Sequence, residues 1–295
     1  MSEATYQSKL NTMKKVNSLS GGKTSSYIAA NYPADYNVFS LVRTDDKKCL
    51  FPDAKIRQEV SDRLGTEFIG TLEEDMIIYT MLDLEQFIGS KIDWVTGKTF
   101  DEIILRKNGT TFLPSYMRRF CTTEMKVEPI KEFWFNKIKE PVEMRIGFRA
   151  NEHKRAKSMI NRLNEKGFEC DKFITGKSKN GRNKWSEIDW RKPVFPLIDD
   201  NIFKDTIENY WKNKKVRFAW MNNCVGCMHK EPILLNKMSR IHPNKLEWFA
   251  SKERVSKNGA TWRENITYDE IISHNIQTEL FDDDFNECDS GYCGL

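Results

Sequence analysis

The chain has 295 residues, enough for one large domain or a domain with an appendage, and 39% of them are hydrophobic and 31% charged. No apolar run approaches the roughly 18 residues that a membrane helix needs, and the N-terminal residues lack the apolar core of a secretory signal. With 47 basic and 43 acidic residues the formal net charge is +4, too small to indicate nucleic-acid binding by itself. These features predict a cytoplasmic globular protein with no membrane partner.

Short apolar segments alternate with amphipathic ones along most of the chain. Residues 53–64 are expected to form a helix, because Ile56, Val60 and Leu64 recur at a spacing of four and Gly65 is a suitable stop. Further helices are expected from residue 25, over 152–166, and from a cap at Asp199 and Asp200 to about residue 212. We expect strands at 15–18, 37–42, 67–70 and 142–148. Strands that alternate with helices predict an α/β fold with a doubly wound, mostly parallel sheet and helices on both faces.

The segment SLSGGKTSS at residues 18–26 joins the first expected strand to the first expected helix. Its Gly-Lys-Thr also ends the common phosphate loop, G-x-x-x-x-G-K-[ST], but the first glycine of that pattern would fall on Asn17. The pattern Ser-Gly-Gly-x-x-Ser is matched instead, by Ser20, Gly21, Gly22 and Ser25. Two glycines let an anion approach the backbone closely, and the N–H groups that open a helix point toward it. The segment predicts a phosphate-binding loop, which also contains Lys23 and Thr24, with a plain turn of small residues as the alternative.

Seven cysteines are present, and in a cytosolic chain we expect thiols or metal ligands rather than disulfides. Cys224 and Cys227 are separated by two residues, one of them Gly226, and this spacing lets both sulfurs face one metal ion. Two ligands cannot complete such a site, so others must come from elsewhere in the chain. Thiolates suit an iron–sulfur cluster or zinc. Cys49 and Cys170 have no partner at such a spacing and are expected to be ordinary thiols.

Several segments resemble, in the right order, the motifs of one enzyme family. They are the loop at residues 20–25, CTTEMKVEPI at 121–130, IGFRANE at 146–152, NCVGC at 223–227 and the tail YCGL at 292–295. Together they are similar to the phosphoadenosine phosphosulfate reductase family, in its cluster-containing branch, within the PP-loop superfamily of nucleotide alpha-hydrolases and ATP pyrophosphatases. The chain departs from the family pattern at Thr24, where Asp is usual, at Thr122, which replaces a second cysteine, and at Tyr292, which replaces Glu.

The resemblance implies an adenine nucleotide alpha-hydrolase-like fold and an adenine nucleotide in the loop, with or without Mg²⁺. It also implies a [4Fe–4S] cluster, with zinc as the second choice, held by Cys121, Cys224 and Cys227. The fourth ligand would be Cys288 or Cys293, and a Cys293 outside the cluster would be a nucleophile for a sulfonucleotide. The domains expected are a tail at 1–14, a nucleotide-binding α/β domain at 15–200 and a cysteine-containing helical region at 201–295.

Charged residues near the ends of the expected strands complete the predicted site. Arg149 follows the strand at 142–148 and is expected to clamp a phosphate or sulfate. Lys23 can supply charge to the same anion, and we place it with Arg149 and Cys293 among the catalytic residues. Asp45 follows another strand and is expected to bind Mg²⁺ or the ribose, with helix capping or solvent contact as the alternative.

Three functions stay open from the sequence. The first is a sulfonucleotide reductase-like enzyme with a thioredoxin-like reductant as partner, and the second is an ATP pyrophosphatase that adenylates and thiolates a nucleic acid. The third is a non-catalytic, nucleotide-binding regulatory protein. The basic stretch at 172–192, which includes Trp185 and Trp190, bears on the first two, because it is either a solvated loop or a strap over a polyanion. A homo-oligomer is also compatible with the sequence.

Overall fold

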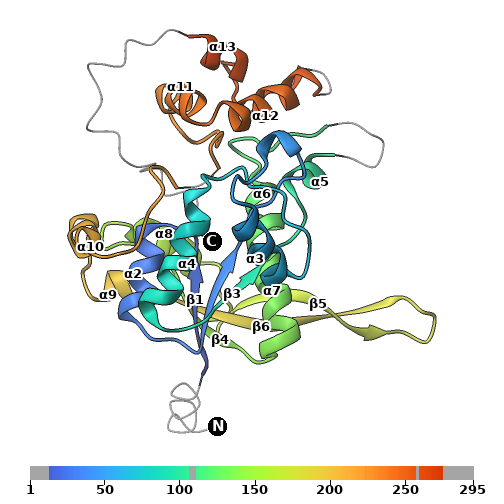
Figure 1. Ribbon diagram of the computed structural model, residues 1–295. Helices are drawn as coiled ribbons and strands as arrows, with labels where there is room; N and C mark the ends of the chain where they lie inside the picture. The colour runs from blue at the N-terminus through green and yellow to red at the C-terminus, as the bar shows by residue number, and fades with distance from the viewer. Residues whose placement is uncertain (1–12, 106–110, 223, 257–258, 275–295) are drawn as a thin grey trace, which may run out of the picture.

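The computed structural model describes residues 13–105, 111–222, 224–256 and 259–274. Within these ranges the chain has an α/β fold around a six-stranded, mostly parallel sheet with the strand order β3-β2-β1-β4-β6-β5 (Figure 1). Only β5 runs antiparallel to its neighbour in this described sheet. The strands are β1 (Lys15–Leu19), β2 (Tyr36–Ser40), β3 (Ile92–Val95), β4 (Val142–Arg145), β5 (Glu169–Lys177) and β6 (Asn183–Val194).

The order of the strands reverses at β1. The chain passes from β1 outward to β2 and β3, and then returns to place β4 on the other side of β1. In an open parallel sheet, the connections that leave two such neighbouring strands separate and create a crevice at their carboxyl ends. The residues after β1 and β4, which include the predicted loop and Arg149, therefore border one crevice.

Helices cover both faces of the sheet. Alternate residues of a strand point to opposite faces, so Leu19 and Phe39 lie in one hydrophobic cluster and Val16 and Val38 in another. The first cluster includes residues of α2 (Lys23–Asn31), α4 (Met76–Ile88) and α10 (Lys204–Trp211), and the second includes residues of α7 (Glu128–Phe133) and η3 (Trp134–Ile138). The remaining elements of the sheet-containing part are η1 (Lys47–Cys49), α3 (Ala54–Leu64), α6 (Phe120–Thr122), η2 (Thr123–Val127), α8 (His153–Ile160) and α9 (Pro196–Asp199).

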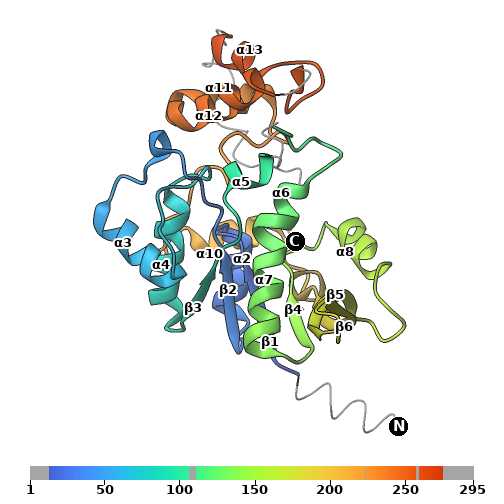
Figure 2. The ribbon, with the colours of Figure 1, turned by 90° about the vertical axis from the view of Figure 1, so that its right-hand side faces the viewer.

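A third hydrophobic cluster belongs to the C-terminal helices. It joins α11 (Pro232–Ile241), α12 (Pro243–Arg254) and α13 (Tyr268–Ser273) to α5 (Phe100–Ile104). The rings of Phe100, Trp248, Phe249 and Trp262 pack edge to face or tilted, with centroids 5.0–6.4 Å apart. Figures 1 and 2 show these helices beyond the carboxyl ends of the parallel strands, so they stand over the crevice side of the sheet.

One expected strand is wrong. Residues 67–70 form no strand, and Gly70 makes only isolated bridges with Thr44 and Leu50. The strand that pairs with β2 on the side away from β1 is β3, through the register Phe39↔Trp94. Residues 67–70 instead lie against the turn around Cys49. The two backbone segments approach so closely there that Gly70 has no room for a side chain.

Two expected helices have different bounds. The helix expected over 152–166 ends at Ile160, because the Asn164 side chain accepts the backbone N–H groups of Lys166 and Phe168 and so favours a turn. The helix expected to follow a cap at Asp199 and Asp200 begins only at Lys204 as α10, and those aspartates end the short α9. The helix at 53–64 is confirmed, with the Asp53 side chain as its cap and Gly65 in the left-handed conformation at its end.

The basic stretch at 172–192 is not a loop but most of a long hairpin formed by β5 and β6. Trp190 and Arg191 are buried at its base, where Arg191 forms an ion pair with Glu169 at 2.8 Å. Trp185, by contrast, is 58% exposed. Across the described ranges, no helix has both the length and the apolar composition that crossing a membrane requires.

Candidate functional site

The predicted phosphate loop follows β1 directly and opens α2. Ser25 Oγ accepts the Ser20 N–H at 3.1 Å, lies 3.1 Å from Ser20 Oγ, and donates to the Gly22 carbonyl at 3.1 Å. Gly22 is the N-cap of α2 and provides no side-chain cap, so the first N–H groups of the helix stay open to an anion. Gly21 has a φ of +81°, which favours glycine.

Side chains from two other segments, at Ile77 and Asn222, pack closely against this loop. A Cβ built on Gly21 would lie 2.5 Å from Ile77 Cγ2 in the first turn of α4, and one built on Gly22 would lie 2.5 Å from Asn222 Nδ2. Gly147, after β4, is close on the other side, since its Cβ would lie 3.8 Å from the Ser25 nitrogen. Sequence reasoning missed Ile77 and Asn222, because such long-range contacts leave no local pattern.

Arg149 lies after β4, at the same crevice, but its guanidinium is held by its own segment. Glu152 accepts the Arg149 backbone N–H at 2.8 Å and its Nε at 3.2 Å, and it also forms an ion pair with Arg155. Burial alone would raise the pKa of Glu152, but these hydrogen bonds and charges keep that pKa below its ordinary value. Glu152 is therefore a carboxylate that orients Arg149.

The other charged candidates are also engaged. Lys23 forms an ion pair with Glu208 of α10, and its carbonyl accepts Trp211 Nε1 at 3.0 Å. Asp45 accepts the Thr99 hydroxyl at 2.7 Å, at the N-terminus of α5. These contacts associate Lys23 with α10 and Asp45 with α5, and their predicted roles toward a nucleotide stay predictions.

The segment that contains Cys224 runs beside the phosphate loop. The Val225 N–H donates to the Leu72 carbonyl at 2.7 Å, and the backbones of Cys224 and Glu73 form an isolated antiparallel β-bridge. Asn222, which touches the loop, is two residues before Cys224, a separation of at most about 7 Å along the chain. The contact with Leu72 and Glu73 thus brings a thiol next to the loop.

Cys121, Cys224 and Cys227 gather against the core of the C-terminal helices. Cys224 and Cys227 share a tight turn, in which the Cys227 N–H donates to the Cys224 carbonyl at 3.0 Å. Burial, and then the neighbouring Cys227 thiol, raise the pKa of Cys121 to about 11, and burial followed by the charge of Glu73 raises that of Cys224 well above its ordinary value. The thiols of Cys121 and Cys224 are therefore protonated near neutral pH unless a metal displaces their protons.

Three sulfur donors fit the chemistry of an iron–sulfur cluster or of zinc. In the part of the chain that the structure describes, no three Cys, His, Asp or Glu side chains converge closely enough to hold a metal ion. Cys288 and Cys293, the predicted fourth ligand or nucleophile, lie outside the described residues. The three thiols share one region, and their ligation of a metal stays a prediction.

Glu73 and Lys126 form an ion pair at 2.8 Å beside the thiols. The Glu73 side chain is fully buried, and its second carboxylate oxygen has no hydrogen-bond partner among the described residues. Lys126 counteracts the rise in the pKa of Cys224, so it supplies positive charge to the thiol. Lys126 lies within the motif at residues 121–130, whereas no local pattern in the sequence marks Glu73.

Of the two cysteines expected to be ordinary thiols, Cys49 belongs to the same hydrophobic cluster as this group, and Cys170 lies on the sheet. Cys49 is buried, and its burial raises its pKa to about 12. Cys170 lies on β5, where its thiol is 2.9 Å from Asp189 Oδ1. No family model, curated protein or solved structure matches the chain.

Proposed function

We propose that the chain is an enzyme that binds an adenine nucleotide through the loop at Ser20–Ser25 and carries out sulfur chemistry at the thiols beside it. One observation carries the proposal: Asn222 touches the loop at Gly22, and Cys224 follows two residues later. A phosphate loop and a group of cysteines are then one site. We infer a doubly wound fold like that of the adenine nucleotide alpha-hydrolases, supported by the strand order and by the crevice at β1 and β4.

The loop would hold the phosphate or sulfate of the nucleotide. The open N–H groups of α2 and the Ser20 hydroxyl are donors suited to an anion, while the Ser25 hydroxyl, which donates to the Gly22 carbonyl, would hold the loop in shape. Arg149 and Lys23 would add charge, and their present partners, Glu152 and Glu208, orient them before the nucleotide binds. Cys121, Cys224 and Cys227 would hold a [4Fe–4S] cluster, which when bound supplies an electron-rich sulfur environment next to the nucleotide.

The first candidate reaction is that of a sulfonucleotide reductase. A thiolate, with Cys293 as the predicted nucleophile, attacks the sulfur of an adenylyl sulfonucleotide, and the S–O bond to the phosphate breaks as the adenosine phosphate leaves. A dithiol of a thioredoxin-like partner then reduces the cysteine S-sulfonate. The dithiol becomes a disulfide, the cysteine thiol is restored and sulfite is released.

A second candidate is the adenylation and thiolation of a nucleic acid, and one observation favours it. The hairpin of β5 and β6 carries exposed lysines and one exposed arginine, Arg182, near an exposed Trp185, which suits a polynucleotide better than a small sulfonucleotide. In this reaction an oxygen of a base takes AMP from ATP as pyrophosphate leaves. Hydrosulfide then displaces AMP, which carries that oxygen away.

Calorimetry of nucleotide binding tests the loop. We expect Gly22→Ala to weaken the binding of ATP, or of an adenylyl sulfate, at least tenfold, which is about 1.4 kcal/mol, because the new methyl group fills the space that an anion needs. The methyl would also meet the Asn222 amide. The double variant Gly22→Ala/Asn222→Gly removes that contact, so a loss of affinity that persists in it belongs to the loop.

Gly176→Ala is the matched control, since a Cβ at this hairpin position meets no atom within 4 Å and its affinity should not change. Unchanged binding of both nucleotides by a folded Gly22→Ala variant would show that the loop is not the nucleotide site.

A further inference from the structure

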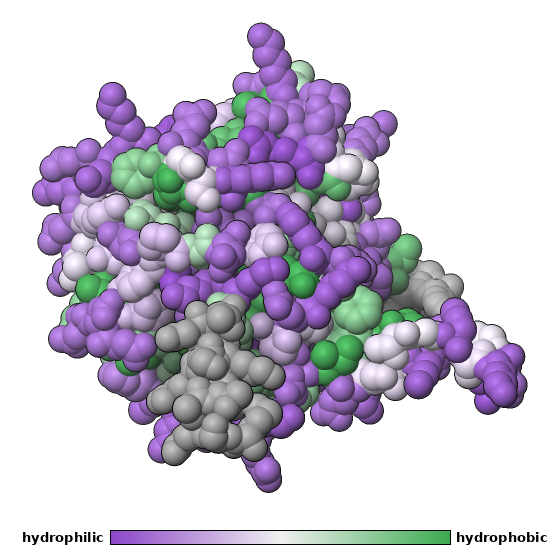
Figure 3. Space-filling model, turned by 90° about the horizontal axis from the view of Figure 1, so that it is seen from below, coloured by the Kyte–Doolittle hydropathy of each residue, from purple (hydrophilic) through white to green (hydrophobic). Residues whose placement is uncertain are grey.

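The hairpin of β5 and β6, which we call the arm (residues 169–194), extends beyond the rest of the sheet. Of the residues of β6, only 191–194 pair with β4. The earlier residues of β6 pair only with β5 within the described sheet. Figures 1 and 3 show the arm projecting from the body, with a hydrophilic tip. Trp185 lies nine residues before Val194, so it is about 30 Å from the carboxyl edge of the sheet.

The outer part of the arm is uniformly basic. Residues 172–184 contain five cations and no acidic residue, and these five charges exceed the net charge of +4 of the whole chain. All five side chains are exposed, and no ion pair joins any of them to another described residue; they are Lys172, Lys177, Lys179, Arg182 and Lys184. Lys177 contacts only the neutral Asn183 side chain, at 2.5 Å. Because no carboxylate of the described fold neutralises these five cations, all of them are available to bind an anionic partner.

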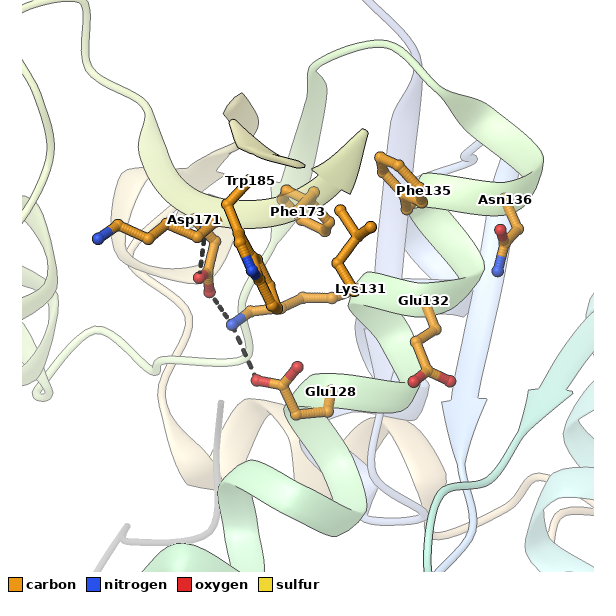
Figure 4. A pocket seen from close by; sticks show the side chains of 10 residues that line it. Glu128, Lys131, Glu132, Phe135, Asn136, Asp171, Phe173 and Trp185 are labelled. Carbon is orange, nitrogen blue, oxygen red and sulfur yellow. Dashed lines mark hydrogen bonds and ion pairs between the residues drawn. The ribbon is translucent and has the colours of Figure 1, made fainter. Parts of the chain in front are cut away.

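Aromatic and apolar side chains line a pocket next to this basic part of the arm. Trp185 and Ile174 are register partners on the same face of the arm and are 58% and 42% exposed. With Phe135 and Phe173, whose rings stack at 5.0 Å, they line an open pocket of about 260 Å³ between the arm and α7 (Figure 4). That volume lies just below the range of pockets that hold small molecules. It suits one planar ring stacked on Trp185.

Carboxylates occupy the floor of the same pocket. Lys131 lies between Glu128, at 3.0 Å, and Asp171, and so balances both (Figure 4). Glu132, which also lines the pocket, has no such partner among the described residues. A carboxylate repels phosphate but accepts hydrogen bonds from the exocyclic amino group of a base.

We propose that the arm binds single-stranded nucleic acid, with phosphates on the cations of residues 172–184 and one base stacked on Trp185 in the pocket. Duplexes do not fit this mode, because their bases are already stacked on one another. Glu132 makes bases that carry an amino group preferred over thymine or uracil. The inference rests on the arm and on the residues of α7 and η3 that line the pocket with it, and not on the proposed function. At about 30 Å from the sheet edge the arm anchors a strand rather than presenting a reacting base.

Fluorescence anisotropy on the full chain tests the charges. Labelled 20-mers of dA, rA and dT and a 20-base-pair duplex are titrated over a range of salt concentrations. The triple variant Lys177→Ala/Lys179→Ala/Arg182→Ala should reduce the slope of log K against log salt by about 2, because each phosphate that a cation neutralises on a single strand adds about 0.7 to that slope. The control is Lys212→Ala/Lys214→Ala/Lys215→Ala, which removes three exposed lysines after α10 and should leave the slope unchanged.

The pocket is tested separately. Trp185→Ala should weaken binding at least about fivefold with an unchanged salt slope, whereas Phe203→Ala, a change at an aromatic residue that is 45% exposed before α10, should have no effect. Glu132→Ala should reduce the preference for dA over dT, because it removes the acceptor of the amino group, whereas a glutamine would still accept through its amide oxygen. Comparing rA with dA shows which nucleic acid is the better ligand.

Three results would overturn the proposal: duplex bound as tightly as single strands, an arm triple variant with wild-type affinity and slope, or an arm variant that changes only the oligomeric state. Loss of nucleic-acid binding with ATP binding intact separates the arm from the phosphate loop.

Discussion

At the scale of single residues, Glu73 places a fully buried carboxylate next to the candidate thiols. Lys126 neutralises it at 2.8 Å, and the Glu73 carbonyl also accepts Lys245 Nζ at 2.6 Å. A buried ion pair stabilises a fold little relative to apolar residues of similar size, but the loss of one partner leaves an uncompensated charge. We interpret the pair as the means by which a positive charge is held beside Cys224.

Changing the pair one residue at a time should be costly. We expect Lys126→Met to lower the free energy of unfolding by about 3–5 kcal/mol, because Glu73 then stays buried without a counter-charge. The double variant Glu73→Gln/Lys126→Met should recover most of that loss. Urea denaturation measures both.

Lys98→Met is the control for this pair. Lys98 is 65% exposed in its ion pair with Glu124, and its removal should cost less than about 1 kcal/mol. If Lys126→Met and Lys98→Met cost the same, the pair with Glu73 has no special role.

At the scale of elements, the turn of Cys224–Cys227 joins the phosphate loop to the C-terminal helices. Gly226 within it has the Phe249 ring of α12 against its backbone, and its carbonyl accepts the Tyr268 hydroxyl at 2.8 Å. These two contacts hold the turn against α12 and α13. Metal ligands in such a turn would couple metal binding to the docking of α12 and α13.

Anaerobic purification with iron and sulfide assays tests this turn. We expect Cys224→Ala and Cys227→Ala to lose most of the iron and to destabilise the fold, because ligation of a cluster is cooperative. Cys49→Ala should do neither, although Cys49 is also buried. Colourless protein that contains zinc would contradict the cluster and leave a structural metal site.

Cys293→Ala then separates the roles of the tail. Loss of iron would make Cys293 the fourth ligand, and retained iron with lost turnover would make it the nucleophile. Retained iron and activity would assign neither role to it.

Local patterns predict an element well only where its signals lie within one segment. The helix 53–64 is predictable because its cap, spacing and stop lie within one segment. β3 carries alternating buried residues, Ile92 and Trp94, which could have identified it, yet the similarly short and apolar segment 67–70 favours a strand that does not form. The arm resembles a loop in sequence because its charges mask the cross-strand pairing that defines it.

At the scale of the whole molecule, the α/β fold can be predicted from the alternation of strands and helices along the sequence, but the assembly of the candidate site cannot. Asn222 reaches the loop from two hundred residues away in the chain. Contacts of that kind depend on how α11 and α12 dock, which no local pattern encodes. Lys245 of α12 is central to this docking, because its Nζ reaches Asp75 at 2.7 Å, at the start of α4, as well as the Glu73 carbonyl.

We therefore expect the sheet and the C-terminal helices to unfold together. Hydrogen exchange followed by mass spectrometry across a urea series should give one midpoint for peptides of β1 and of α12. Lys245→Met should lower the midpoint of α12 below that of β1, because it removes both buried contacts with the start of α4. Arg240→Met, an exposed change on α11, should leave the midpoints together, and separate midpoints in the unmodified chain would refute the coupling.

β5 closes one side of the described sheet, so its nine residues present a free edge. Such an edge can recruit a strand from another molecule and start aggregation, and lysine is a common protection against it. The two acidic residues of this strand are paired within the fold, Glu169 with Arg191 and Asp171 with Lys131, so the unpaired charges along the edge are those of Lys172 and Lys177, and two such edges repel each other. Neutralising the lysines, for example by acetylation, would remove this protection, and the concentration that the protein tolerates before it aggregates would fall.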